Sequence, residues 1–299
     1  MANYTYGVPP FTTTTFTSTI AGTNDAIVAN TSDNFTINGN GGQDTVTSGS
    51  GDDTITTTFG NDVITAGNGN NTVTAGGGVN TVTTGSGADT ITTSGGADNI
   101  IAGHGNNTVT TGGGADTVSS GSGNDTITTG AGADIVNSRS GNDGITTGTG
   151  NDIINAGTGS DTVNGGTGND RITSGAGIDS LAGGGGHDTF MYGSLTDALL
   201  GADIISDFRL SNPTIPGDGD VLNLRFLVDD FTGLSGASLA DLVASGHLDF
   251  NGDSSNTVIS FDSNGSAALG SAGTLVTLSG VAFVSEMNSL LALADNIVV

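Results

Sequence analysis

The sequence predicts an all-β protein: a right-handed parallel β-roll with 18 residues per coil, followed by a β-rich C-terminal domain. Three observations lead to this prediction. A nine-residue repeat runs through residues 39–191 as seventeen units without an insertion, each unit has an apolar residue at its eighth position, and ordinary strand patterns begin after Met191. Short repeats of this kind stack as coils of a solenoid, and the crossovers between parallel strands are right-handed.

Each repeat unit follows the pattern x-Gly-x-Gly-Asn/Ala-Asp-Thr-Ile/Val-Thr, as in residues 120–128. The Gly-rich first six residues predict a turn, and the last three predict a strand with one apolar centre. One unit is then expected to bury only that one side chain, so units must stack in order to fold, with two units per coil. The apolar centres, from Val46 to Ile172, should meet between the two rows of strands.

The composition excludes several classes of function. The chain has a formal net charge of -26 and only four cationic side chains, all of them Arg, so it cannot neutralise a row of phosphates and we expect no nucleic-acid partner. The absence of Cys excludes disulfides and thiolate metal sites. Because no run of about 18 apolar residues occurs, we also expect no membrane insertion.

The acidic residues point to a metal. Of the 30 acidic residues all but Glu286 are Asp, and the sixth position of the repeat is Asp in fourteen of the seventeen units. Coils stacked about 4.8 Å apart would align these carboxylates in two columns, and their repulsion would be prohibitive without cations. Ca²⁺ fits this arrangement, because it takes about six to eight oxygen ligands from carboxylates and backbone carbonyls.

We therefore predict several bound Ca²⁺ ions. The predicted ligands are Asp44, Asp53, Asp62, Asp89, Asp98, Asp116, Asp125, Asp134, Asp143, Asp152, Asp161, Asp170, Asp179 and Asp188. Weaker candidates are Asn71, Asn80, Asn107, Asp25, Asp218 and Asp220. At Asn71 and Asn107 we expect either weak calcium binding or amide hydrogen bonds in place of the ion.

With these residues the chain resembles the RTX nonapeptide-repeat proteins, whose pattern is Gly-Gly-x-Gly-x-Asp-x-apolar-x. The resemblance covers about half of the chain. We expect an N-terminal arm or cap over residues 1–20, the β-roll over 21–191 and a C-terminal domain over 192–299. In the last of these, strands are predicted at 202–208, 218–224, 247–250, 256–261 and 274–278.

The C-terminal segment resembles the target domain of type I secretion substrates, and the terminal residues Asp295 to Val299 fit an uncleaved C-terminal signal. This resemblance implies export of an unfolded chain by type I secretion machinery from a bacterium, to the medium or the cell surface. Folding would follow outside, where weak calcium sites become occupied.

No catalytic pattern stands out. The three His residues, His104, His187 and His247, lack the His-Glu-x-x-His spacing of a zinc protease, and no Gly-x-Ser-x-Gly elbow precedes a helix. We expect no enzyme.

The outward positions of the strands carry pairs of Thr, at Thr54 and Thr56, Thr72 and Thr74, Thr90 and Thr92, Thr108 and Thr110, and Thr126 and Thr128. Three interpretations stay open: simple β-propensity, a contact between subunits, or ice binding, since the rows are similar to the Thr-x-Thr ranks of β-solenoid antifreeze proteins.

The predicted function is that of a secreted calcium-binding structural protein. It is expected to assemble with copies of itself into a surface layer, filament or extracellular matrix, and it resembles calcium-dependent bacterial surface-layer and adhesin repeat proteins. Leftover carboxylates such as Asp52, Asp229 and Asp230 could bridge subunits through calcium. The alternatives are an ice-binding protein and an adhesin module that binds a surface or glycan through residues 192–299.

Overall fold

The computed structural model of the chain describes residues 3–5, 14–17, 23–29, 32–192, 202–210, 219–224, 242, 248–252, 255–261, 273–279, 281 and 297–298. The chain divides into two compact units, Met1–Gly148 and Thr149–Val299. The elements whose bounds the structure describes are all β-strands, and Leu242 is helical. Among the described residues, no helix has the length and apolar character needed to cross a membrane.

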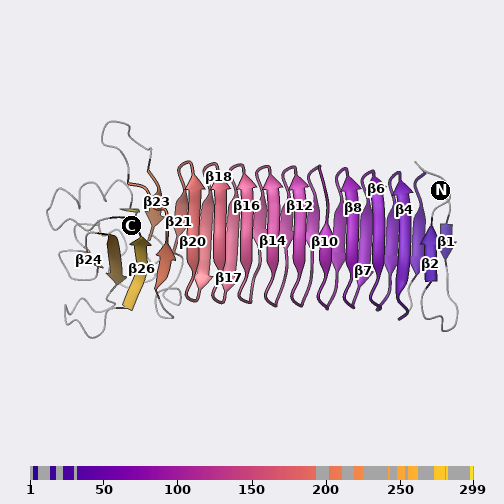
Figure 1. Cartoon of the computed structure of the whole chain (residues 1–299), viewed down its shortest axis with the longest axis horizontal. Coiled ribbons are helices and arrows are strands. Elements are labelled where there is room, and N and C mark those ends of the chain that lie inside the picture. The colour runs from indigo at the N-terminus through magenta and orange to yellow at the C-terminus, as the bar shows by residue number, and fades with distance from the viewer. Residues whose placement is uncertain are drawn as a thin grey trace. The chain divides into compact units, whose positions relative to one another are not determined.

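The first unit consists of two parallel sheets whose strands alternate along the chain (Figure 1). One sheet contains β1 (Asn3–Thr5), β3 (Ala26–Ala29), β5 (Thr45–Ser48), β7 (Val63–Gly67), β9 (Thr81–Thr84), β11 (Asn99–Ile101), β13 (Thr117–Ser119) and β15 (Ile135–Asn137). The other contains β2 (Thr14–Thr17), β4 (Phe35–Gly41), β6 (Thr54–Phe59), β8 (Thr72–Gly77), β10 (Thr90–Thr92), β12 (Thr108–Gly113) and β14 (Thr126–Ala131). Strand β16 (Gly144–Thr149) lies at the boundary between the units.

The second unit begins with the same alternation. One row contains β17 (Ile153–Thr158), β19 (Arg171–Ala176), β21 (Thr189–Met191), β23 (Val221–Asn223) and β27 (Ile297–Val298), all parallel. The other contains β18 (Thr162–Thr167), β20 (Ser180–Gly185), β22 (Asp203–Ile205) and β26 (Gly273–Ser279), also parallel. Strands β25 (Asn256–Phe261) and β24 (Leu248–Gly252) then add antiparallel neighbours.

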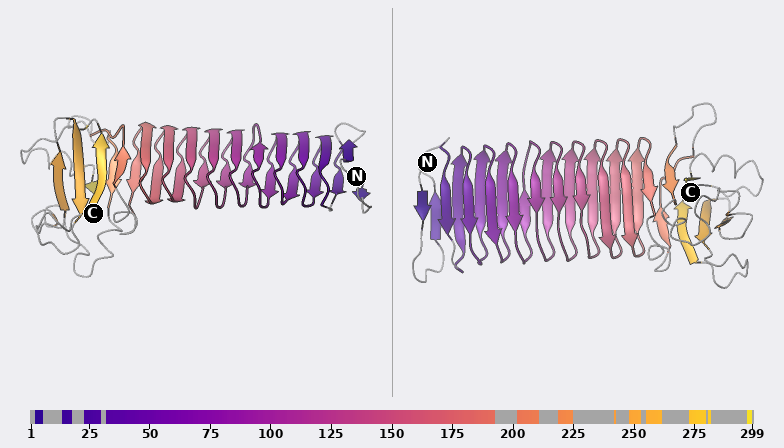
Figure 2. Two further views of the ribbon diagram at one scale, coloured as in Figure 1. Left: turned by 60° about the horizontal axis from the view of Figure 1, so that its bottom comes forward. Right: turned by 180° about the vertical axis from the view of Figure 1, so that it is seen from behind.

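The strand register confirms the predicted parallel β-roll with 18 residues per coil. In the first unit Val46 pairs with Ile64, and Ile55 with Val73, each 18 residues further on. The same offset joins Ile154 to Ile172 in the second unit. Figure 2 shows the resulting stack of strands and short turns from two further sides.

The eighth positions form the core, as the sequence predicts. Their side chains are at most 2% exposed: Val46, Ile55, Ile64, Val73, Val82, Ile91, Ile100, Val109, Val118, Ile127, Val136, Ile145, Ile154, Val163, Ile172, Leu181 and Phe190. The expectation of one buried side chain per unit is nevertheless wrong, because the first and sixth positions are buried as well. The coil is thin, so the small first-position residues, such as Ser48 and Ala66, fit between its two edges.

Most buried hydroxyls at the first position donate along the stack, although the Thr57 hydroxyl has no hydrogen-bond partner among the described residues. Ser48 Oγ donates to the Ala66 carbonyl at 2.8 Å, and Thr93 Oγ1 donates to the Thr111 carbonyl at 3.1 Å, one coil further on. Polar side chains can therefore line the interior without the cost of an unsatisfied hydroxyl.

The fourth position of the unit requires Gly. At Gly132 the backbone φ is +148°, and a Cβ there would lie 1.6 Å from the Gly114 carbonyl oxygen of the preceding coil. The second position tolerates exceptions, since Asn40 and Arg139 adopt φ values of 56° and 76°. The tight turn between coils is therefore what fixes the Gly pattern of the repeat.

Of the C-terminal strands predicted from sequence, 256–261 coincides with β25, and 202–208, 218–224 and 274–278 overlap β22, β23 and β26. The strand predicted at 247–250 overlaps β24, although His247 lies outside the described residues. The division at residues 20/21 and 191/192 stays a prediction. The parallel pairing of β1 and β2 with β3 and β4 gives the segment 1–20 two strands of the stack.

Candidate functional site

The sixth-position side chains lie in two columns, as the stacking predicts. Within each unit of the fold, the backbone N–H of one sixth-position residue donates to Oδ1 of the sixth-position residue one coil later. The Asp44 N–H donates to Asp62 Oδ1 at 2.8 Å, and the Asp170 N–H donates to Asp188 Oδ1 at 3.0 Å. One oxygen of each carboxylate is thus part of the stack itself.

The second oxygen, Oδ2, has a different environment. The side chains of all fourteen sixth-position Asp residues are at most 2% exposed, and their Oδ2 atoms are buried. In nine of them, Oδ2 accepts no hydrogen bond from any described residue: Asp44, Asp53, Asp62, Asp89, Asp98, Asp116, Asp125, Asp170 and Asp188. A buried carboxylate oxygen without a donor costs several kcal/mol unless a cation compensates it.

The three Asn units show what faces this oxygen. The Nδ2 of Asn71 donates to the carbonyls of Gly67 and Gly69, at 3.3 and 3.1 Å. The Nδ2 of Asn80 likewise donates to the carbonyls of Gly76 and Gly78, both at 3.2 Å. Because Asn and Asp have the same shape, an Asp Oδ2 in this place faces carbonyl oxygens of its own turn.

The third Asn follows the same rule. Asn107 Nδ2 donates to the Gly105 carbonyl at 3.0 Å and to the Ser120 carbonyl at 3.3 Å. In the Asn units, amide hydrogens therefore occupy the position in which an Asp unit would hold a cation. This is the amide alternative that the sequence leaves open for Asn71 and Asn107, and Asn80 shows it as well.

The donor set fits a hard divalent cation. Carboxylate and carbonyl oxygens are the ligands that Ca²⁺ prefers, and the structure brings both to the same turn in the units whose sixth residue is Asp. No three His, Cys, Asp or Glu side chains among the described residues gather around a point. Each site must therefore draw a large share of its ligands from the backbone, and this explains why it depends on Gly turns.

Burial also changes the protonation of the columns. It raises the pKa of Asp53, Asp89 and Asp98, and the hydrogen bonds that backbone N–H groups donate to their Oδ1 atoms only partly oppose this rise. It raises the pKa of Asp170 to about 6, with the charges of Asp152 and Asp188 adding to the effect. The columns are therefore poorly suited to hold negative charge without a cation.

In calcium-free buffer, lowering the pH from about 8 to about 5 is expected to stabilise the fold. Because the carboxyls of Asp170 and Asp203 have a pKa of about 6 and about 7 when folded, against an ordinary value of 3.8, the folded state binds more protons than the unfolded state. Stability then rises as the pH falls through these values. The β signal by circular dichroism in chelator checks this: it should increase as the pH is lowered from about 8 to about 5, and a signal that does not increase would contradict the prediction.

The substitution Asn71→Asp is expected to add one calcium ion per chain. It replaces the amide that donates to Gly67 and Gly69 with a carboxylate oxygen, which restores the oxygen set of the other units. Isothermal titration calorimetry measures the number of ions. The matched control is Asn70→Asp, the same charge change at an exposed neighbour, which should leave the number unchanged. An unchanged number for Asn71→Asp would show that its turn cannot hold calcium.

The columns continue past the regular repeat, to residues that the period alone does not reveal. The Asp179 N–H donates to Asp203 Oδ1 at 2.9 Å over a spacing of 24 residues, and the Asp188 N–H donates to Asp220 Oδ1 at 3.1 Å over 32 residues. A local signal for both existed, since each Asp precedes a buried Ile205 or Leu222 by two residues, as the sixth position precedes the eighth.

These two end residues differ from the fourteen. Asp203 Oδ2 accepts a hydrogen bond from the Ser174 hydroxyl at 3.1 Å, and burial raises the pKa of Asp203 to about 7. Asp220 Oδ2 accepts the Arg209 N–H at 2.8 Å. The sequence predicted Asp220 as a weaker ligand and did not identify Asp203.

The remaining predicted residues lie as follows. Asp25 is buried at the start of one column, where its N–H donates to Asp44 Oδ1 at 3.0 Å and its carboxylate accepts the Thr23 hydroxyl at 3.2 Å. The side chain of Asp52 is exposed, and its Oδ1 accepts the Asn70 N–H at 2.7 Å. Asp218, Asp229 and Asp230 lie outside the described residues.

The Thr pairs lie in register on the outer face of one sheet of the first unit. Thr54 pairs with Thr72, and the ranks continue through Thr90 and Thr108 to Thr126. The second rank pairs Thr56, Thr74, Thr92, Thr110 and Thr128 in the same way. Eight of the ten are exposed, and Thr56 and Thr92 are half-buried.

Comparison with known proteins agrees with this geometry. A family model described as RTX calcium-binding nonapeptide repeat (4 copies) matches residues 21–55, 47–82, 56–91, 83–118, 110–145, 139–172, 146–181 and 164–199. These overlapping matches cover more than half of the chain. No curated protein matches it.

Proposed function

The chain belongs to the RTX calcium-binding nonapeptide repeat family, and from this premise we propose that it is an extracellular structural protein that folds on binding calcium and assembles with copies of itself. RTX repeats bind multiple Ca²⁺ ions, and RTX proteins are typically secreted bacterial proteins. The proposal adds export by a type I system and assembly into a layer, filament or matrix.

The observation that carries the proposal is that the column carboxylates lie at the turns and not on the outer faces of the sheets. The column carboxylates are buried at the turns, while the outward strand positions of the first unit are Thr, Ser, Asn and aliphatic residues. Val63, Ile101 and Ile135 are 45–46% exposed on the outer face of the sheet that contains β7, β11 and β15. These faces can pack against another copy without burying a charge.

We expect calcium binding to control this assembly. A net charge of -26 keeps copies apart by repulsion, and each bound divalent ion reduces that charge by two. The same event orders the coils and so creates the flat faces. Assembly should therefore begin at the calcium concentration at which the sites of the carboxylate columns become occupied.

Negative-stain electron microscopy of the purified full chain, with and without millimolar calcium, tests the proposal. We expect sheets or filaments only with calcium. As a contact test, Ile101→Asp should prevent assembly and leave the circular dichroism spectrum in calcium unchanged. The control is Thr110→Asp, which places the same charge on the opposite sheet and should still allow assembly. Single particles of the wild-type chain in calcium would contradict self-assembly.

Ice binding is a second candidate function, because the Thr ranks are in register over five strands, from β6 to β14. Such ranks repeat about every 4.8 Å across strands and about every 6.7 Å along them. If they bind ice, Thr90→Tyr should abolish thermal hysteresis without changing the circular dichroism spectrum. Thr117→Tyr, at an exposed position on β13 of the other sheet, is the matched control.

A further inference from the structure

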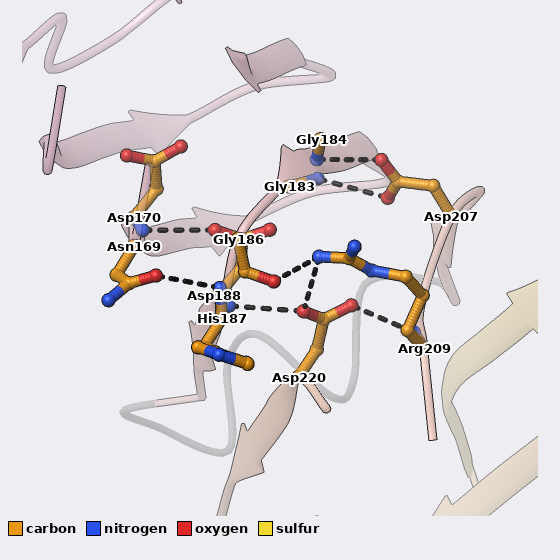
Figure 3. A network of polar contacts seen from close by, with 10 residues as sticks. All are labelled: Asn169, Asp170, Gly183, Gly184, Gly186, His187, Asp188, Asp207, Arg209 and Asp220. Atoms are coloured by element: carbon orange, nitrogen blue, oxygen red, sulfur yellow. Dashed lines mark hydrogen bonds and ion pairs between the residues drawn. The ribbon is translucent and has the colours of Figure 1, made fainter. Parts of the chain in front are cut away.

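The end of one carboxylate column in the second unit is closed by a positive side chain (Figure 3). The column runs from Asp152 through Asp170 and Asp188 to Asp220. At Asp220 the guanidinium of Arg209 lies 3.5 Å from Oδ1, and the Arg209 backbone N–H donates to Oδ2 at 2.8 Å. The last carboxylate is therefore compensated within the chain.

The same guanidinium also donates to the Gly186 carbonyl. Gly186 is the fourth residue of its repeat unit, and the fourth-position carbonyl is the one that the Asn side chains use in their units, at Gly69, Gly78 and Gly105. Arg209 thus contacts both kinds of oxygen, carboxylate and turn carbonyl, that would hold a cation in the column. Unlike the Asn amides, it also brings a full positive charge.

A neighbouring contact fixes the same segment to the roll. Asp207, two residues before Arg209, accepts the Gly183 N–H at 3.0 Å with Oδ1 and the Gly184 N–H at 2.7 Å with Oδ2 (Figure 3). These N–H groups belong to β20. The packing of Phe208 against Phe190, with ring centroids 6.0 Å apart, adds an apolar contact between the two aspartate-bearing segments.

We propose that Arg209 takes the place of a calcium ion at the end of this column, so that the contacts of Asp207, Arg209 and Asp220 with residues 183–188 form before calcium binds. The inference rests on the calcium-dependent folding proposed above.

Hydrogen exchange of the full chain in chelator tests the proposal. The Asp152 and Asp188 N–H groups make the same bond to a column carboxylate, at 2.9 and 3.1 Å, so they form a matched pair. We expect exchange at Asp188 and Gly183 to be about tenfold slower than at Asp152, as charge-assisted hydrogen bonds allow. Arg209→Gln should remove this difference and Arg209→Lys should retain part of it.

The control variant is Arg171→Gln, which removes an exposed Arg from β19 of the same unit and should leave the difference intact. A difference that persists in Arg209→Gln would overturn the proposal. Fast exchange at all three amides in wild-type chelated protein would overturn it while leaving calcium-dependent folding standing. Equally slow exchange at all three would overturn both.

Discussion

Removal of calcium is expected to unfold the stacked coils of the roll. Each site filled at about 100 times its Kd contributes about 2.7 kcal/mol, so a few such sites already equal the total stability of about 5–15 kcal/mol that a typical domain has. Without the ions, fourteen buried carboxylates remain, and burial of their charge opposes folding.

Circular dichroism in excess chelator and in millimolar calcium measures this effect. We expect most of the β signal to be lost in chelator and recovered when calcium is added back, with magnesium as the control ion, since its smaller, near-octahedral shell suits carbonyl-rich turns poorly. The same β content in chelator and in calcium would show that the columns are stable without a cation.

Replacing Gly132 by Ala is expected to lower the thermal midpoint of the calcium-loaded protein by about 6–12 °C. The new Cβ would lie 1.6 Å from the Gly114 carbonyl oxygen, at a backbone φ of +148° that side chains rarely adopt. Strained backbone and overpacking together cost about 3 kcal/mol or more, which corresponds to that shift for a unit of this size.

Gly144→Ala is the matched control for this variant. Gly144 lies in strand β16, and a Cβ there would be 4.0 Å from its nearest neighbour, the Asp125 carbonyl oxygen. Since Ala loses less conformational entropy than Gly on folding, the midpoint should stay the same or rise. A midpoint for Gly132→Ala within a degree or two of wild type would mean that the turns can shift without cost.

The sequence alone was sufficient for the regular part of the fold. The strict nine-residue period determines the 18-residue coil, the buried eighth positions such as Ile55, and the alignment of the sixth-position Asp residues in columns, because each follows from stacking identical units. The burial of the first position was not predicted, since Ser48 and Thr84 look like exposed turn residues until the thin coil places them between its edges.

The ends of the columns were less accessible to prediction. Asp203 and Asp220 occupy column positions after longer connections, with spacings of 24 and 32 residues in place of 18, so a fixed period does not reach them. The contacts of Asp207 and Arg209 with the turn at Gly183 to Gly186 depend on how those connections fold back. No local sequence pattern indicates how these connections fold back onto the roll.

The most direct test of the calcium columns is anomalous X-ray diffraction from crystals grown in calcium. The geometry predicts anomalous peaks beside the Oδ2 atoms of the sixth-position Asp residues, and none beside Nδ2 of Asn71, Asn80 and Asn107, where amide hydrogens already contact the turn carbonyls. Peaks of equal height at the Asn units, or peaks only on the exposed carboxylates such as Asp52, would contradict it.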